Sequence, residues 1–83
     1  MLERGRVTYD AEADALYVRL VSRPVAYTRA KGDLRMVDYA QDDTVVGVEF
    51  LQASGGIDLS DLPEPKEIEQ LISQGGLHLS IFA

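Results

Sequence analysis

Residues 7–20, VTYDAEADALYVRL, contain two alternating apolar runs joined by an acidic, alanine-rich segment. Val7 and Tyr9 alternate with a polar residue in the first run, and Leu16 and Val18 do so in the second. A period of two is typical of a strand with one buried face and one exposed face. The short acids of the DAEAD segment can bond nearby backbone N–H groups and close a turn. This stretch predicts a β-hairpin, around which the rest of the chain is organised.

Three further alternating runs follow the hairpin. Residues 25–30 (VAYTRA) favour a third strand. Residues 34–39 (LRMVDY) and 44–51 (TVVGVEFL) predict a second hairpin, whose turn has no glycine. If that turn needs a left-handed residue, Asp43 is the one best suited to it. Gly47 has no side chain to pack, so it indicates a bulge or a close approach by another backbone.

The last third of the chain changes from strand to helix periodicity. Residues 57–62 are a short apolar and acidic connector. Pro65 suits the first position of a helix, and Gly75-Gly76 suits its end. Residues 77–82 alternate again, which favours a closing strand. We therefore expect an α+β fold in which a small antiparallel sheet of two hairpins, about four to five strands, packs against one short C-terminal helix, with a final edge strand.

The length of 83 residues predicts a single domain, since a second hydrophobic core would need a chain roughly twice as long. Residues 7–54 would form the sheet core, and residues 57–83 would add the helix and the terminal strand. The absence of cysteine excludes disulfides, thiolate zinc sites and cysteine nucleophiles. No stretch approaches the roughly 18 to 20 apolar residues of a membrane span, so we expect a soluble cytoplasmic protein.

The net charge of −6 disfavours binding to nucleic acid, because affinity for phosphate needs clustered Lys and Arg. The charge is divided unevenly, with +2 on residues 1–35 and −8 on residues 36–83. A charge run is more often a solvated surface, but such asymmetry is also typical of a chain with an oriented partner. The acidic C-terminal half would suit a basic protein.

Three motifs in the chain resemble those of one small bacterial family. Residues 9–17 read YDAEADALY, residues 37–39 read VDY and residues 45–51 read VVGVEFL. In this order they resemble the domain of unknown function 2283 family, although the loop before the third motif lacks the family's usual glycine. The resemblance implies a small β-rich domain with no known activity, and it transfers no functional residue. Members are regarded as companions of small toxin-like proteins, which implies an antitoxin-type role as an alternative.

The sequence contains no convincing metal or catalytic motif. Asp10, Glu12 and Asp14 have the first three ligand positions of a calcium loop, but Ala15 stands where the EF-hand needs glycine and Val21 where it needs glutamate. We interpret these acids as a hairpin turn. The single histidine and the SGG segment match no catalytic or phosphate-binding pattern. We therefore expect no enzyme, no cofactor and no metal.

Tyrosine and arginine recur at alternate positions of the predicted strands. We expect them to share one sheet face, opposite an apolar face that carries Leu16, Val18 and Met36. Interfaces favour such a face, because Tyr and Arg combine large contact area with hydrogen-bonding tips. The alternatives for this face are an ordinary solvent-exposed surface and a site for an anionic ligand or nucleic acid. The predicted interaction face comprises Tyr17, Arg19, Tyr27, Arg29, Arg35 and Tyr39.

These observations predict a non-enzymatic protein-interaction module, most simply a homodimer formed through an exposed sheet face or edge strand. The alternative is an antitoxin-like inhibitor of a small basic partner encoded nearby. Neither a membrane nor a nucleic acid is an expected partner.

Overall fold

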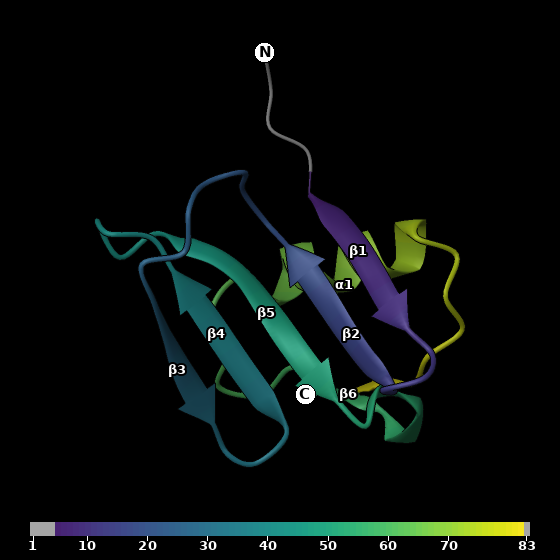
Figure 1. The fold of residues 1–83 in the computed structure, drawn as a ribbon. Helices are drawn as coiled ribbons and strands as arrows, with labels where there is room; N and C mark the ends of the chain where they lie inside the picture. The colour runs from purple at the N-terminus through teal and green to yellow at the C-terminus, as the bar shows by residue number, and fades with distance from the viewer. Residues whose placement is uncertain (1–4, 83) are drawn as a thin grey trace.

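The computed structural model describes residues 5–82, which form a five-stranded antiparallel sheet with one helix behind it (Figure 1). The strand order is β1-β2-β5-β4-β3, so the pairing of β2 with β5 joins the two predicted hairpins. The α+β class and the antiparallel sheet are confirmed. The strands are β1 (Arg6–Asp10), β2 (Ala15–Arg19), β3 (Tyr27–Lys31), β4 (Arg35–Tyr39) and β5 (Val45–Leu51).

The hydrophobic core lies between the sheet and the helix α1 (Pro65–Gln74). Val18 from β2 and Phe50 from β5 point to this side and are at most 2 % exposed. Ile68 and Ile72, one helical turn apart, cover them and are fully buried. Burying a side chain of this size stabilises a fold by about 1.5–3 kcal/mol. This shared burial fixes the helix on one face of the sheet.

The helix α1 begins at the proline that the sequence predicts as its first residue, where a missing N–H costs no hydrogen bond. It contacts β1 and β2 and ends before Gly75 and Gly76, of which Gly76 has a φ of 75°. Glu64, which precedes the helix, is left-handed with a φ of 52° and makes no capping hydrogen bond through its side chain. Among residues 5–82, no helix is long and apolar enough to cross a membrane.

The last residues differ from the prediction of an edge strand over residues 77–82. Only β7 (Ile81–Phe82) is a strand, and it pairs in parallel with β6 (Ile57–Asp58) rather than with the main sheet. A short 3₁₀ turn, η1 (Ala53–Gly55), leads into β6. Ile57 is fully buried, and the backbone N–H groups of Ile57 and Leu59 donate to the carbonyl oxygens of Ser80 and Phe82. The C-terminal strand therefore pairs with the connector after the main sheet, and not with an edge of the main sheet as we expected.

A bulge interrupts the pairing of β4 with β5. The register shifts between Asp38 and Tyr39, which leaves Val46 without a partner in β4. The bulge is adjacent to Gly47, where the sequence predicts a bulge or a close backbone approach. The turn before β5 is confirmed as well, since Asp43 is left-handed with a φ of 69°.

Candidate functional site

One face of the sheet has no other element of residues 5–82 packed on it, and we call it the outer face (Figure 1). Because side chains alternate along a strand, the register identifies which residues point to it. All five strands contribute, with charged, aromatic and apolar side chains together. The outer face comprises Arg6, Thr8, Asp10, Ala15, Tyr17, Arg19, Thr28, Ala30, Met36, Asp38, Gly47, Glu49 and Leu51.

These residues form rows that run across the strands in the order β1, β2, β5, β4, β3. The first row has two cations at one end and an acid near the other, and the second row is mostly uncharged. The first row is Arg6, Arg19, Gly47, Asp38 and Thr28. The second row is Thr8, Tyr17, Glu49, Met36 and Ala30, and a third, shorter row contains Asp10, Ala15 and Leu51.

The side chain of Tyr17 crosses β5 to reach Asp38 on β4. Its hydroxyl donates a hydrogen bond to the Asp38 carboxylate at 2.8 Å, and the Thr28 hydroxyl donates to the other carboxylate oxygen at 2.6 Å. Gly47 provides the space for this crossing, because a Cβ atom there would lie 2.6 Å from the Tyr17 ring carbon Cζ and 2.7 Å from the carbonyl oxygen of Val18. The glycine therefore allows three strands to be tied together across the outer face.

Each of the three sequence motifs supplies one residue to this contact. Tyr17 ends the YDAEADALY motif, Asp38 is the acid of VDY, and Gly47 is the glycine of VVGVEFL. Burial, together with the hydrogen bond to Asp38, raises the pKa of Tyr17 to about 12. The phenol therefore remains a hydrogen-bond donor at neutral pH. Residue-by-residue reasoning missed Asp38 and Gly47 as parts of this face, although their places in the motifs were a usable signal.

The six residues of the predicted interaction face do not share one face. Tyr17 and Arg19 lie on the outer face, and the other four point to the side that carries the core. Arg35, for example, pairs with the buried Phe50, whereas Met36, which we expected in the core, lies on the outer face. The error arose because the loop between β2 and β3 does not fix which way β3 and β4 present their alternate residues.

On the core side, the tyrosines of β3 and β4 form a small aromatic cluster at the edge of the sheet. The rings of Tyr27 and Tyr39 stack with their centroids 5.0 Å apart, and the guanidinium of Arg29 lies 5.5 Å from the Tyr27 centroid. The Tyr27 hydroxyl donates to the carboxylate of Asp43, and this hydrogen bond raises the pKa of Tyr27. The cluster thus connects the edge strand β3 to the turn before β5.

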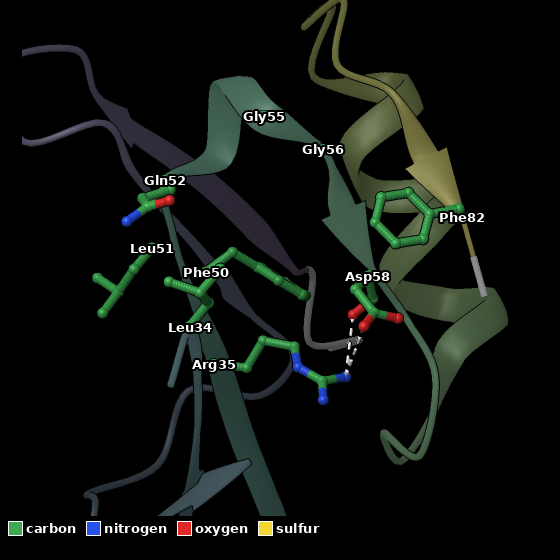
Figure 2. A pocket seen from close by; sticks show the side chains of 9 residues that line it. All are labelled: Leu34, Arg35, Phe50, Leu51, Gln52, Gly55, Gly56, Asp58 and Phe82. Atoms are coloured by element: carbon green, nitrogen blue, oxygen red, sulfur yellow. Dashed lines mark hydrogen bonds and ion pairs between the residues drawn. The ribbon is translucent and has the colours of Figure 1, made fainter. Parts of the chain in front are cut away.

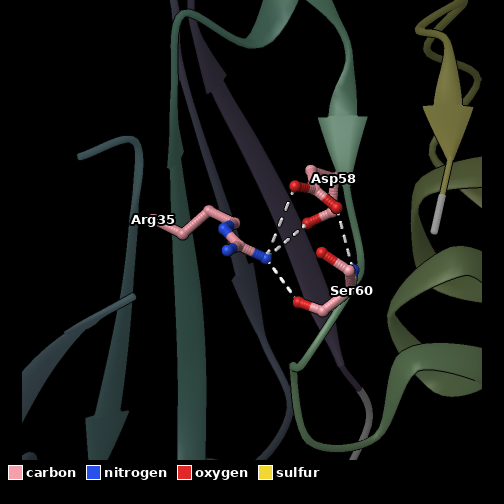
Figure 3. A network of polar contacts seen from close by, with 3 residues as sticks. All are labelled: Arg35, Asp58 and Ser60. Atoms are coloured by element: carbon pink, nitrogen blue, oxygen red, sulfur yellow. Dashed lines mark hydrogen bonds and ion pairs between the residues drawn. The ribbon is translucent and has the colours of Figure 1, made fainter. Parts of the chain in front are cut away.

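Arg35 joins the main sheet to β6 and to the segment that follows it (Figure 3). Its Nη1 atom donates to the carbonyl oxygens of Asp58, at 3.2 Å, and Ser60, at 2.5 Å, and lies 3.9 Å from the Asp58 carboxylate. The hydrogen bonds from Ser60, with a smaller contribution from Arg35, lower the pKa of Asp58. Only 15 % of the Arg35 side chain is exposed, so the residue acts as a clamp between two parts of the fold.

Beside this clamp lies a small hollow of about 200 Å³ (Figure 2). Leu34 and Phe50 line it from the main sheet, and Gly56 and Phe82 line it from the C-terminal segment. Its volume is below the roughly 300–1,000 Å³ of typical small-molecule sites. The hollow marks the seam at which the C-terminal segment meets the end of the sheet.

The acids between β1 and β2 bond to the protein itself. Asp10 accepts two backbone N–H groups within the turn. Asp14 accepts the Tyr9 hydroxyl at 2.7 Å and both the backbone N–H and the hydroxyl of Ser54, at 2.9 and 2.5 Å. These bonds, those from Ser54 foremost, lower the pKa of Asp14. Within the described range, no group of three His, Cys, Asp or Glu side chains is placed to hold a metal ion.

Comparison with known proteins places the sheet in a family. Neither the curated proteins nor the solved structures gave a match. One family model matches residues 6–54, which span β1 to β5 and the whole outer face. The match covers more than half of the chain and contains all three motifs. The chain therefore belongs to the family described as Protein of unknown function (DUF2283).

Proposed function

We propose that this protein is a non-enzymatic interaction domain that binds another protein through the outer face of its sheet. The observation that carries the proposal is the one-sided covering of the five-stranded sheet, which leaves Tyr17, Arg19, Met36 and Leu51 half-buried with no element of residues 5–82 over them. Tyr, Arg and Met are enriched at protein interfaces. A sheet face with this composition is suited to close contact with a partner.

The hydrogen bonds on the outer face support the same role. Asp38 holds Tyr17 and Thr28 in fixed orientations, so less side-chain freedom is lost when a partner binds. Because Gly47 has no side chain, the Tyr17 ring lies close against the backbone of β5, and the centre of the face protrudes little. A rigid and shallow surface of this kind fits a protein better than it fits a small molecule.

A photo-reactive amino acid tests whether the outer face is a contact surface in the native host. We expect cross-linked protein when the reactive group replaces Ala30, which is exposed on the outer face. Gln70 is exposed on the helix and is the matched control position. Cross-linking from Ala30 but not from Gln70 supports the proposal. Equal yields from the two positions, or none from Ala30, would contradict it.

A groove beside the start of the helix favours a second candidate function, the binding of a small basic protein in the manner of an antitoxin. The groove has a volume of about 360 Å³ and an apolar floor that includes Leu20 and Val45. Its rim carries the acids Asp43, Glu64 and Glu67. Charge complementarity would attract a basic segment, and the floor would take its apolar side chains.

Co-expression with a basic protein encoded next to the gene tests this second candidate. We expect a complex and protection from toxicity, both weakened in Glu64→Gln and Glu67→Gln. Glu69→Gln removes the same charge from an exposed helix position outside the groove lining and is the control. If neither a complex nor protection is found, or if all three variants behave alike, the antitoxin candidate fails.

A further inference from the structure

We propose that the partner of the outer face is a second copy of the same chain, packed face to face about a two-fold axis parallel to β5. The inference rests on the proposed function and adds the identity and orientation of the partner. It comes from the rows of residues that the register defines, combined with the symmetry of a homodimer, in which one surface must complement itself.

This axis places β5 on β5, β2 on β4 and β1 on β3 of the second copy. In the first row, Arg19 then faces Asp38 of the second copy, and the symmetry produces the same pair twice. In the second row, Met36 faces the backbone position of Tyr17. The Tyr17 ring crosses β5 over Gly47, so it meets the Tyr17 ring of the second copy near the axis. In the third row, Leu51 faces Leu51. The first and third rows are therefore complementary to themselves, whereas Glu49 of the second row meets its own copy at the axis.

Among residues 5–82, the charges of the first row are unbalanced. Arg6 and Arg19 are direct cross-strand partners, and like charges in that arrangement repel. Neither arginine side chain makes an ion pair with any of residues 5–82. Asp38 receives one hydrogen bond on each oxygen, and a carboxylate oxygen can accept more than one. A second copy would supply Arg19 with an ion-pair partner, which residues 5–82 of its own chain do not.

A face-to-face symmetry with the axis perpendicular to the strands pairs only the more exposed charges. It places each strand on itself and reverses the rows, so that Arg19 faces Ala15 and Gly47 faces Leu51. It would pair Arg6 with Asp10 but leave Arg19 and Asp38 without charged partners. The axis parallel to β5 instead pairs Arg19 with Asp38, which are half-buried, and leaves Arg6 and Asp10, which are exposed, without charged partners. It is therefore the arrangement that pairs the more buried charges.

The size of the face indicates a weak dimer. Five strands about 4.8 Å apart and five residues at about 3.4 Å each span roughly 24 by 17 Å, or about 400 Å² of projected area per copy. Stable interfaces bury roughly 800 Å² of accessible surface per partner, a larger quantity than projected area for a rough surface. The dimer should therefore depend on concentration and should be measured at high protein concentration.

Introduced cysteines test the orientation, since the chain contains none of its own. The proposed axis places Thr8 opposite Ala30 of the second copy and far from the other Thr8. We expect a short bismaleimide to cross-link a mixture of Thr8→Cys and Ala30→Cys proteins, and neither protein alone. Cross-linking of Thr8→Cys alone would overturn this orientation in favour of the perpendicular axis. The absence of any cross-link would overturn the dimer.

Charge-neutral variants test the contacts by sedimentation equilibrium. Arg19→Gln should weaken the dimer by roughly tenfold, as expected for a charge pair at an interface. Arg6→Gln removes the same charge from the same face, but at a position that meets Thr28, and should change the dissociation constant less than threefold by the same reasoning. Both variants relieve the repulsion between the two arginines and should affect the stability of the fold alike. A difference between their dissociation constants would therefore not come from a loss of folding.

Glu49 gives a prediction of the opposite sign. It lies on β5 and therefore meets the Glu49 of the second copy at the axis. Glu49→Gln should tighten the dimer, by roughly two- to fivefold, because the substitution removes a like-charge contact. A monomer at every concentration would overturn the inference. In that case, an outer-face cross-link to a protein of different mass in the host would leave the proposed function standing, whereas no cross-link would remove both.

Discussion

Replacing Gly47 with alanine should destabilise the fold, although the substitution adds only one methyl group. The new Cβ atom would lie 2.6 Å from Cζ of Tyr17 and 2.7 Å from the backbone carbonyl oxygen of Val18. The tyrosine can rotate away, but only by breaking its 2.8 Å hydrogen bond to Asp38. The carbonyl belongs to the central pairing of β2 with β5, so relief there requires the two strands to separate locally.

The expected cost combines three contributions. Overpacking costs about 1–3 kcal/mol, and the lost hydrogen bond to a charged acceptor costs about 1.5 kcal/mol. Alanine recovers about 0.5–1 kcal/mol, because glycine in a strand loses more backbone entropy on folding. The net loss is about 1.5–4 kcal/mol, which lowers the Tm of a domain of this size by roughly 6–30 °C.

Urea and thermal unfolding followed by circular dichroism measure this cost. Gly55→Ala is the matched control, because a Cβ atom at Gly55 meets nothing within 4 Å and the residue has no positive φ. A spectrophotometric titration adds a local readout, since a displaced Tyr17 should lose its pKa of about 12 and titrate closer to 10.

The cost should also depend on the tyrosine. In a Tyr17→Ala background, the Gly47→Ala substitution should cost roughly half as much, because only the carbonyl contact remains. A Gly47→Ala variant within 0.5 kcal/mol of the parent, on the order of an ordinary surface change, would refute this account. An undiminished cost in the Tyr17→Ala background would refute the role of the ring.

Two further predictions concern the polar contacts outside the outer face. Arg35→Met should destabilise the protein by about 2–3 kcal/mol, because the carbonyl oxygens of Asp58 and Ser60 lose their charged donor. Amide hydrogen exchange should increase more in the segment after β6 than in the β1–β2 hairpin. A uniform increase would contradict the role of Arg35 as a clamp. The pKa of Asp14 is lowered in the folded protein, so its ionised form stabilises the fold above the unfolded pKa of about 3.9 and this contribution is lost as the pH falls through the lower folded value. Asp14→Asn should therefore lower the Tm at pH 7 and reduce its fall below pH 4. Asp33→Asn, which removes a carboxylate from an exposed turn position, is the control, and an equal effect of the two substitutions would contradict the role of Asp14.

Local patterns in the sequence were sufficient to predict the five strands of the main sheet and the helix, but not the pairing of β6 with β7. The alternation around the DAEAD turn predicts β1 and β2, and the structure holds that turn through Asp10 and Asp14. Pro65 and Gly75 bound the helix because their backbone preferences act within one turn. Asp43 was identifiable for the same reason, as a short polar residue at a tight turn without glycine.

The direction in which each strand faces was not predictable in the same way. Residues LRMVDY contain apolar side chains at both parities, and the sequence prediction placed Met36 in the core. The structure instead buries Val37 and turns Arg35 inward, where it finds carbonyl acceptors more than twenty residues later in the chain. Such acceptors exist only after the C-terminal segment has packed. The six residues do not share one face for this reason, whereas Tyr17 and Arg19, which both lie in the second strand of the first hairpin, do share the outer face.

The central position of the β2–β5 pairing has a consequence for the speed of folding. The β1–β2 hairpin and the β3–β4–β5 meander can each form from neighbouring chain, but the sheet becomes continuous only when residues 20–44 are closed into a loop. That closure costs on the order of 3 kcal/mol in chain entropy before any cross-strand contact repays it. We therefore expect the folding transition state to contain the contact between Val18 and Val48, so that Val48→Ala slows folding whereas Ile72→Val in the helix mainly speeds unfolding.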